Sequence, residues 1–154
     1  MSVSDNLKKI LSTLPQGVKL VAVTKTHPPE VIMEAYQAGH NIFGENRAQE
    51  MRSKYEVLPK DIEWHFIGHL QSNKVKYIAK IANMIQSIDS LSLLKEVDYY
   101  AKKNKRIASC LLQFHIATEE TKFGLNWEEA CKLLEDPSIT QLKNISIEGV
   151  MGMA

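Results

Sequence analysis

The stretch KLVAVTKTHPPE, residues 19–30, decides the fold class, because a short apolar run ends in a lysine and Pro28 and Pro29 then begin a new element. The uncharged run 20–23 is typical of a strand buried on both faces, as the strands of parallel sheets are. Lys25 shares side-chain parity with Val21 and Val23, so it should lie on their face of the sheet, at the carboxyl end of the strand.

Similar runs recur along the chain, with helix-like segments between them. They lie at 41–46, 63–68, 84–89, 108–116 and 145–153. The first four runs begin about 22 residues apart, the spacing of a compact strand–loop–helix–loop unit. Strands that alternate with helices predict a parallel sheet with right-handed crossovers. No linker or composition shift divides the chain, so we expect 1–154 to form a single domain.

Helix boundaries are marked by residues that begin or end helices. Pro29 suits a helix start and Gly39 the position after a helix end, which predicts a helix over 29–38. Three further helices each follow a residue that suits an N-cap. They are predicted over 73–82 after Ser72, over 91–103 after Ser90 and over 127–135 after Asn126. Weaker periodicity favours helices over 5–13 and 46–57.

Two architectures suit this order of elements, an open doubly wound sheet and a (β/α) barrel. The first strand–helix turn, TKTHPP, lacks the glycines that hold a dinucleotide phosphate, which weighs against the open sheet. Lys25, Asn46 and His69 follow the ends of the first three strands. Polar residues at those ends favour a barrel, because the chemistry of a barrel gathers at that rim.

The composition excludes several classes of protein. The chain has 154 residues and a net charge of +1, which gives no reason to expect a nucleic-acid or membrane-surface partner. No apolar run approaches the roughly 20 residues of a membrane span, and the N-terminus does not have the layout of a signal peptide. Cys110 and Cys131 show no metal-type spacing, and two such cysteines fit a reducing, cytoplasmic setting.

The position of Lys25 suggests a chemical role. An ammonium group half-buried among apolar neighbours loses hydration, which lowers its pKa and favours the nucleophilic neutral amine. Such an amine forms a Schiff base with a carbonyl substrate or with pyridoxal phosphate. The alternative is a lysine that extends into solvent from a strand end.

Five segments in collinear order resemble the pyridoxal-phosphate homeostasis proteins, single-domain relatives of the N-terminal barrel of alanine racemase. They are VAVTKTHPPEVI continuing to FGENRAQE, then EWHFIGHLQSNK, SIDS, ATEETKFG and IEGVMGMA. The resemblance spans essentially 5–154 and implies a (β/α)8 barrel of the TIM type, of fold type III. It implies a cytoplasmic, non-catalytic protein of vitamin B6 homeostasis. Its cofactor, pyridoxal 5′-phosphate, would be held as an internal aldimine by the lysine that ends strand 1, which is Lys25.

The resemblance also points to other cofactor-binding residues, each with a structural alternative. Asn46 would contact the cofactor or cap a helix over 47–57. His65 would lie near the cofactor ring or be a hydrogen-bonded core histidine. Met151 would lie under the ring or pack in the core. No metal site is expected, because His65 and His69 would not share a face in a strand–loop segment.

Two further places are weaker candidates. The loop and helix start with Gln71, Asn73 and Lys74 could attract an anion or be simply solvated. Lys122 matches a family lysine and could receive or steer the cofactor, or be a surface charge.

The resemblance also implies that a family member continues for roughly two more strand–helix units. Those units carry the Ser-Gly-Met-Ser and Arg-Ile-Gly segments that hold the phosphate and approach the pyridine nitrogen. We therefore expect a truncated form, an incomplete barrel of about six units whose first and last strands are open edges. Self-association through those edges is one expected consequence, and pyridoxal-phosphate-dependent apoenzymes are the expected partners of the family.

Two other functions remain open from the sequence. A pyridoxal-phosphate-dependent amino-acid racemase or decarboxylase of the same fold type would use the same lysine, but such enzymes normally need a second domain. A Schiff-base aldolase on an unrelated barrel would explain the lysine but not the segments FGENRAQE and WHFIGHLQSNK.

Overall fold

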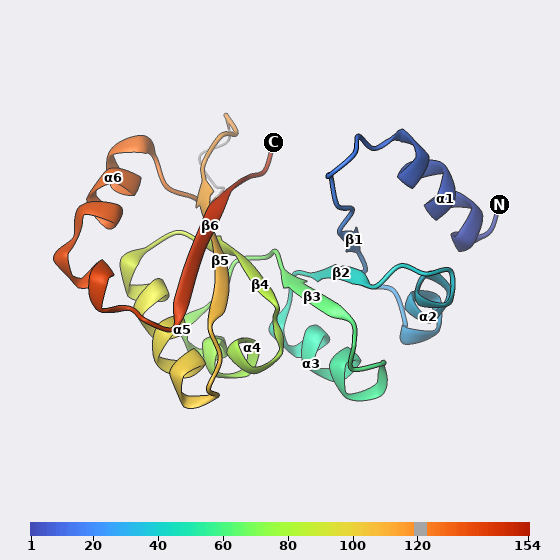
Figure 1. Ribbon diagram of the computed structural model, residues 1–154, viewed down its shortest axis with the longest axis horizontal. Helices are drawn as coiled ribbons and strands as arrows, with labels where there is room; N and C mark the ends of the chain where they lie inside the picture. The colour runs from blue at the N-terminus through green and yellow to red at the C-terminus, as the bar shows by residue number, and fades with distance from the viewer. Residues whose placement is uncertain (119–122) are drawn as a thin grey trace.

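The strands of the chain form one parallel sheet in a computed structural model that describes residues 1–118 and 123–154. The strand order is β1-β2-β3-β4-β5-β6, so each strand pairs with its neighbours in sequence (Figure 1). The strands are β1 Ala22–Val23, β2 Ile42–Glu45, β3 Glu63–Phe66, β4 Met84–Ile88, β5 Ala108–Phe114 and β6 Ile145–Gly152. The helices are α1 Val3–Thr13, α2 Pro29–Gln37, α3 Ala48–Val57, α4 Val75–Ile81, α5 Leu91–Lys103 and α6 Trp127–Glu135, with 3-10 turns η1 Ser72–Lys74 and η2 Pro137–Gln141.

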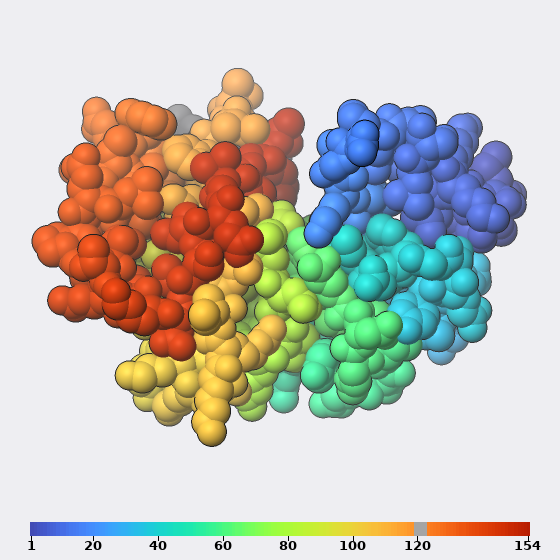
Figure 2. Space-filling view, viewed as in Figure 1, coloured from blue at the N-terminus to red at the C-terminus, as the bar shows by residue number. Residues whose placement is uncertain are grey.

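The sheet is an open arc. β1 and β6 are its two edges, and helices α2 to α5 follow one side of it (Figure 1). The surface is hollowed between the N-terminal segment, in blue, and β6, in red (Figure 2). Six parallel strands, the first five each followed by an α-helix, form a partial barrel of the TIM type, which confirms the predicted fold class.

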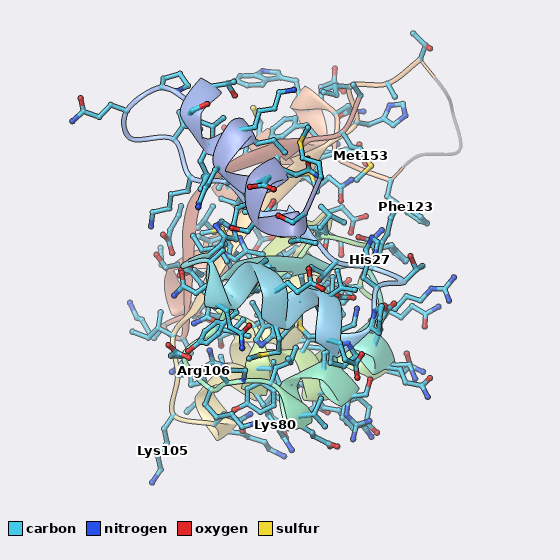
Figure 3. The ribbon with its side chains drawn as sticks, turned by 90° about the vertical axis from the view of Figure 1, so that its right-hand side faces the viewer. His27, Lys80, Lys105, Arg106, Phe123 and Met153 are labelled. Carbon is cyan, nitrogen blue, oxygen red and sulfur yellow. The ribbon has the colours of Figure 1, made fainter. Side chains whose placement is uncertain are left out.

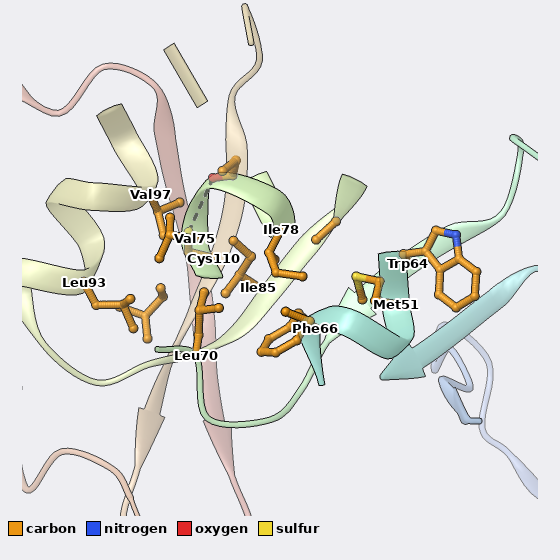
Figure 4. Packing of buried hydrophobic residues seen from close by; sticks show 14 of the residues in the cluster. Met51, Trp64, Phe66, Leu70, Val75, Ile78, Ile85, Leu93, Val97 and Cys110 are labelled. Atoms are coloured by element: carbon orange, nitrogen blue, oxygen red, sulfur yellow. Dashed lines mark hydrogen bonds between the residues drawn. The ribbon is translucent and has the colours of Figure 1, made fainter. Parts of the chain in front are cut away.

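The core lies between the outer face of the sheet and the helices. Phe43, Trp64, Phe66 and Ile85 project from β2, β3 and β4 toward α3 and α4 and are at most 1% exposed. The helices contribute Met51, Val75 and Ile78, also fully buried, to the same cluster (Figure 4). Burying one such side chain contributes about 1.5–3 kcal/mol, so this layer supplies most of the driving force for folding.

The inner face of the sheet has a different composition. Val23, Gly44 and His65 are aligned across β1, β2 and β3 and alternate with the buried aromatic residues. A Cβ atom added to Gly44 would lie 3.0 Å from Val21 Cγ1, so Val21 shares this face. Val23 is 49% exposed, because no layer covers the inner side at the β1 edge.

Two helices match the predicted boundaries because their caps are made by side chains. Ser90 accepts a hydrogen bond from the backbone N–H of Leu93 at the start of α5. Asn126 and Glu129 form a reciprocal capping box at the start of α6. None of the helices in the described ranges is long and apolar enough to cross a membrane.

Three local predictions are wrong. The first strand is only Ala22–Val23, because the chain turns at Lys25 and Thr26. Ser72 does not cap a helix; it begins η1, and α4 follows without a side-chain cap. Asn46 does not cap α3 either, since the N-cap position is Arg47 and its side chain makes no capping hydrogen bond.

Candidate functional site

The carboxyl ends of the parallel strands all lie on one side of the molecule. His27 follows β1, Phe123 lies beyond β5, and Met153 follows β6, and the three are grouped on that side in Figure 3. Lys105 and Arg106 precede β5 and lie at the opposite end. In parallel α/β folds the strand ends that carry the first group are where ligands bind.

A cavity of about 300 Å³ lies at these strand ends. It is lined after β2 and β3 by Asn46, Ile67, Gly68 and His69, near the end of β5 by Gln113, and beyond β5 and β6 by His115, Phe123 and Met153. The ring of His69 stacks on that of Phe123, with centroids 3.8 Å apart and planes 7° apart, so two distant segments meet at this wall. Apolar walls with a few polar groups are the usual composition of a small-molecule pocket.

Gly68 allows the loops after β2 and β3 to come together. A Cβ atom at this position would lie 2.3 Å from the backbone oxygen of Asn46, so a larger residue would push the loops apart. Close backbone approach of this kind is a reason for glycine that sequence periodicity does not reveal.

Asn46, one of the residues that line this cavity, has an unused hydrogen-bond acceptor. Its Oδ1 atom is buried and has no hydrogen-bond partner, and the side chain does not cap α3. Buried polar atoms in proteins are nearly always hydrogen-bonded, so an orphaned acceptor in a pocket is a place where a ligand donor can bind.

Lys25 lies just beyond the carboxyl end of β1, the strand that neighbours β2. The pairing of Val23 with Gly44 continues through the Thr24 N–H, which donates to the Gly44 oxygen at 3.0 Å. Lys25 follows in the turn after β1, as Asn46 follows β2, and it is not among the residues that line the cavity. The lysine is exposed rather than half-buried, which corrects the sequence-based expectation. The reason is the open inner face, which leaves this edge of the sheet without a covering wall.

His65 lies deeper, one inner-face position before Ile67, and does not line the cavity. Gln86 Nε2 donates to His65 Nδ1 at 2.8 Å, so the ring proton of the neutral histidine is on Nε2, 3.6 Å from a Glu63 oxygen. Burial lowers the pKa of His65 below its ordinary value, against the opposing charge of Glu63. A neutral imidazole with a fixed tautomer is the consequence.

Met151 lies near the cavity without lining it. It is half-buried on β6 and pairs in register with Gln113, which does line the cavity. The methionine on the cavity wall is Met153, two residues further along the chain. Sequence reasoning missed Met153, Gln113 and Phe123, although the carboxyl ends of the runs 108–116 and 145–153 pointed to that rim.

The weaker candidates fall in different places. Gln71 and Lys74 line a second hollow beside the start of α3, together with Asn46 and His69. Lys122 lies outside the residues that the structure describes. Within 1–118 and 123–154, no three His, Cys, Asp or Glu side chains gather closely enough to hold a metal ion.

The open parallel arc with its cavity at the strand ends defines an alanine-racemase-type barrel domain. The family profile described as alanine racemase, N-terminal domain, matches residues 2–154. The pyridoxal phosphate homeostasis protein of Aquifex aeolicus is 42% identical, over 98% of this chain and 70% of the relative. That of Synechocystis is 41% identical, over 93% of this chain and 66% of the relative. The chain belongs to the pyridoxal phosphate homeostasis protein family, as the sequence segments predicted.

Solved structures agree with this assignment. PipY of Synechococcus elongatus superposes with a TM-score of 0.89 without PLP (37% identity) and 0.87 with PLP bound (35% identity). Each comparison covers 99% of this chain and 71% of PipY. Alanine racemase from Clostridium difficile, at 17% identity and a TM-score of 0.77, shows the same fold alone. The human relative is longer, and this chain spans 59% of it.

Proposed function

We propose that residues 1–154 form a single partial-barrel domain that binds pyridoxal 5′-phosphate and takes part in intracellular vitamin B6 homeostasis. The observation that supports this most is the position of Lys25 just beyond the carboxyl end of β1, since the cavity lies at the same ends of the neighbouring parallel strands. The names of the relatives and the bound ligand of a PipY structure point to the same cofactor. Two free cysteines are compatible with the proposed cytoplasmic location.

The residues at the strand ends fit this cofactor. The cavity of about 300 Å³ is at the lower end of the roughly 300–1,000 Å³ of ligand pockets. Phe123, Met153 and Ile67 offer apolar surface to an aromatic ring. The orphaned Asn46 Oδ1 can accept a hydrogen bond from a ring substituent such as the phenolic hydroxyl.

Lys25 is assigned the covalent attachment. The cofactor would supply an aldehyde there, and the neutral amine of Lys25 would be the group that condenses with it, with loss of the carbonyl oxygen and the two amine protons as water. Met151 and His65 are proposed to support the site from the inner face, His65 through its hydrogen bond with Gln86.

Absorbance spectroscopy tests the attachment. Titration with pyridoxal 5′-phosphate should give the visible band of a lysine-bound cofactor, and the band should be absent in Lys25→Ala. Lys74→Ala is the matched control, because Lys74 lines the neighbouring hollow. Equal bands in wild type and Lys25→Ala would refute the assignment.

The domain is proposed to bind the cofactor without turning over an amino acid. The relatives are named as homeostasis proteins, and the similarity to racemases lies at 14–18% identity, which shows fold alone. Incubation of the cofactor-loaded protein with L-alanine should leave the circular dichroism of the amino acid unchanged. Measurable racemisation that is lost in Lys25→Ala would favour the enzyme instead.

Association through the sheet edges is a further part of the proposal. The backbone of β1 and β6 is paired on one side only, and Val150 on β6 is 66% exposed. Exposed parallel edges recruit other strands, so a second copy of the chain is the expected partner there, with cofactor-requiring apoenzymes as recipients elsewhere. Sedimentation velocity should show concentration-dependent dimers, and a dilute folded monomer at all concentrations would contradict this.

A further inference from the structure

The side of β2 that faces α3 carries a buried cluster of charges that has no part in the site described above. Glu45 is 0% exposed and Lys54 of α3 is 4% exposed. Lys54 Nζ lies 2.8 Å from Glu45 Oε2 and 2.7 Å from Glu50 Oε2. Removing charges from water is costly, and apolar residues of similar volume are often at least as stabilising. Stability alone therefore does not explain the cluster.

The cluster is connected to the turn that carries Lys25. An ammonium group has three N–H donors, and the third contact of Lys54 Nζ is with the Thr24 carbonyl oxygen at 2.8 Å. On the other side, the backbone N–H of Thr26 donates to Glu50 Oε2 at 2.7 Å. The peptide groups before and after Lys25 are thus both held by the same charges.

The backbone conformation of Thr26 is unfavourable in itself, so this turn depends on stabilising contacts. Its φ of 67° lies in the left-handed region, which a β-branched residue rarely adopts. Such strain persists only where the surroundings fix it, and it concentrates at functional sites. Burial alone would raise the pKa of Glu50, but the hydrogen bonds from Lys54 and the Thr26 amide lower it, so the carboxylate stays ionised. The Thr24 hydroxyl also donates to Glu45.

We propose that Glu45, Lys54 and Glu50 are positioning residues, which hold the Lys25 turn so that the amine stays at the carboxyl end of β1, on the side of the molecule where the cavity lies. The inference rests on the proposed function, because it concerns the amine assigned there to cofactor attachment. With both flanking peptide groups fixed, only side-chain torsions of Lys25 remain to be ordered when the amine meets an aldehyde, which raises the rate of reaction.

The test compares two glutamates of α3. Glu50→Ala removes the acceptor of the Thr26 amide, and Glu56→Ala is the matched control, because Glu56 is exposed on the same helix. The first measurement, without cofactor, is the hydrogen-exchange rate of the Thr26 amide by NMR. We expect it to rise about tenfold in Glu50→Ala relative to Glu56→Ala, since an amide without its partner exchanges from a more open turn.

The second measurement is the rate at which pyridoxal 5′-phosphate forms the Lys25-dependent band. We expect a rate about tenfold lower in Glu50→Ala than in Glu56→Ala, because misplacement of a reacting group slows its reaction. Glu50→Gln keeps an oxygen acceptor and should give an intermediate rate. Circular dichroism confirms that each variant folds, and the partly exposed Glu50 makes folding robust to its loss.

The outcomes separate the inference from the proposed function. If wild type forms the band and Glu50→Ala forms it at the same rate, the positioning role is refuted, whatever the exchange rate. If neither wild type nor Glu56→Ala forms a Lys25-dependent band, the proposed function fails. In that case an unchanged exchange rate of the Thr26 amide in Glu50→Ala also refutes the role of the charges in holding the Lys25 turn. A faster exchange rate supports that structural role and overturns the role in cofactor attachment.

Discussion

The two faces of the one sheet are built for different purposes. The outer face presents Phe43, Trp64 and Phe66 to the helices, and all three are fully buried. The inner face presents Val23, Gly44 and His65, which are aligned with one another across β1, β2 and β3. Because side chains alternate along a strand, each strand serves both faces at once. The outer face supplies stability, and the inner face, with the strand ends above it, carries the groups available for chemistry.

Alanine substitution of one side chain on each face should give the largest difference in the free energy of unfolding. Phe66→Ala on the outer face should lower the free energy of unfolding by about 3–5 kcal/mol, because it leaves a cavity in the core. Val23→Ala on the exposed inner edge should change it by only about 0.5 kcal/mol. Urea denaturation measures both values. Similar losses in the two variants would mean that the inner face is also a packed layer.

Alanine substitutions at two glycines should show that the strand ends tolerate an added side chain less well than the rest of the inner face. At Gly68 the added Cβ meets the Asn46 oxygen at 2.3 Å, whereas at Gly149 it meets Leu111 Cδ2 at 3.5 Å, an ordinary contact. Gly68→Ala should therefore cost about 1–3 kcal/mol of stability and weaken cofactor binding. Gly149→Ala should change neither stability nor cofactor binding. Thermal unfolding measures the first and a binding titration the second, and equal effects of the two variants would contradict the prediction.

The asparagines at the two ends of β2 give a smaller and more selective effect. Asn46→Ala removes an unpartnered acceptor, so the free energy of unfolding should stay within about 0.5 kcal/mol of wild type. Its affinity for pyridoxal 5′-phosphate should fall about fivefold, the value of one hydrogen bond. Asn41→Ala, at the other end of the strand, should bind as wild type does. Equal affinities for all three proteins would remove Asn46 from the site.

The smallest effect is a pH dependence from the inner face. Burial lowers the pKa of His65 in the folded protein, so the unfolded chain binds the proton more tightly. The contribution of His65 to stability is therefore full above its unfolded pKa of about 6.5 and is lost as the pH falls from there toward the folded pKa. His65→Gln should lose less stability than wild type between about pH 7 and pH 5.5.

The exposed His27 is the control for this titration. His27→Gln should keep the pH dependence of wild type in urea denaturation at each pH. A steeper loss of stability in His65→Gln than in wild type would contradict the assigned direction of the pKa shift.

Much of the fold could be predicted because local signals agreed with it. Proline, serine and asparagine at helix starts predicted α2, α5 and α6 almost residue for residue, since their side chains act on their own helices. The prediction failed where tertiary contacts decide the outcome. β1 is short because its turn is held by Glu50, a residue of α3 that sequence spacing does not connect to it.

The site was predictable only in outline. Lys25 and Asn46 both follow strand ends on one side of the molecule because the strands are parallel, but the exposure of Lys25 depends on an uncovered edge. The buried Glu45 and Lys54 were missed, because charged residues are normally assigned to the surface. A signal was present, since Glu45 shares parity with Phe43 and Lys54 lies three residues after Met51.

The central claim is that one inner-side amine, Lys25, anchors the cofactor at the strand ends. Borohydride reduction of the protein with stoichiometric pyridoxal 5′-phosphate, followed by peptide mass spectrometry, tests it most directly. We expect a single phosphopyridoxyl group, on the peptide that contains Lys25. Modification spread over many lysines, or concentrated on Lys74 with Lys25 untouched, would contradict it.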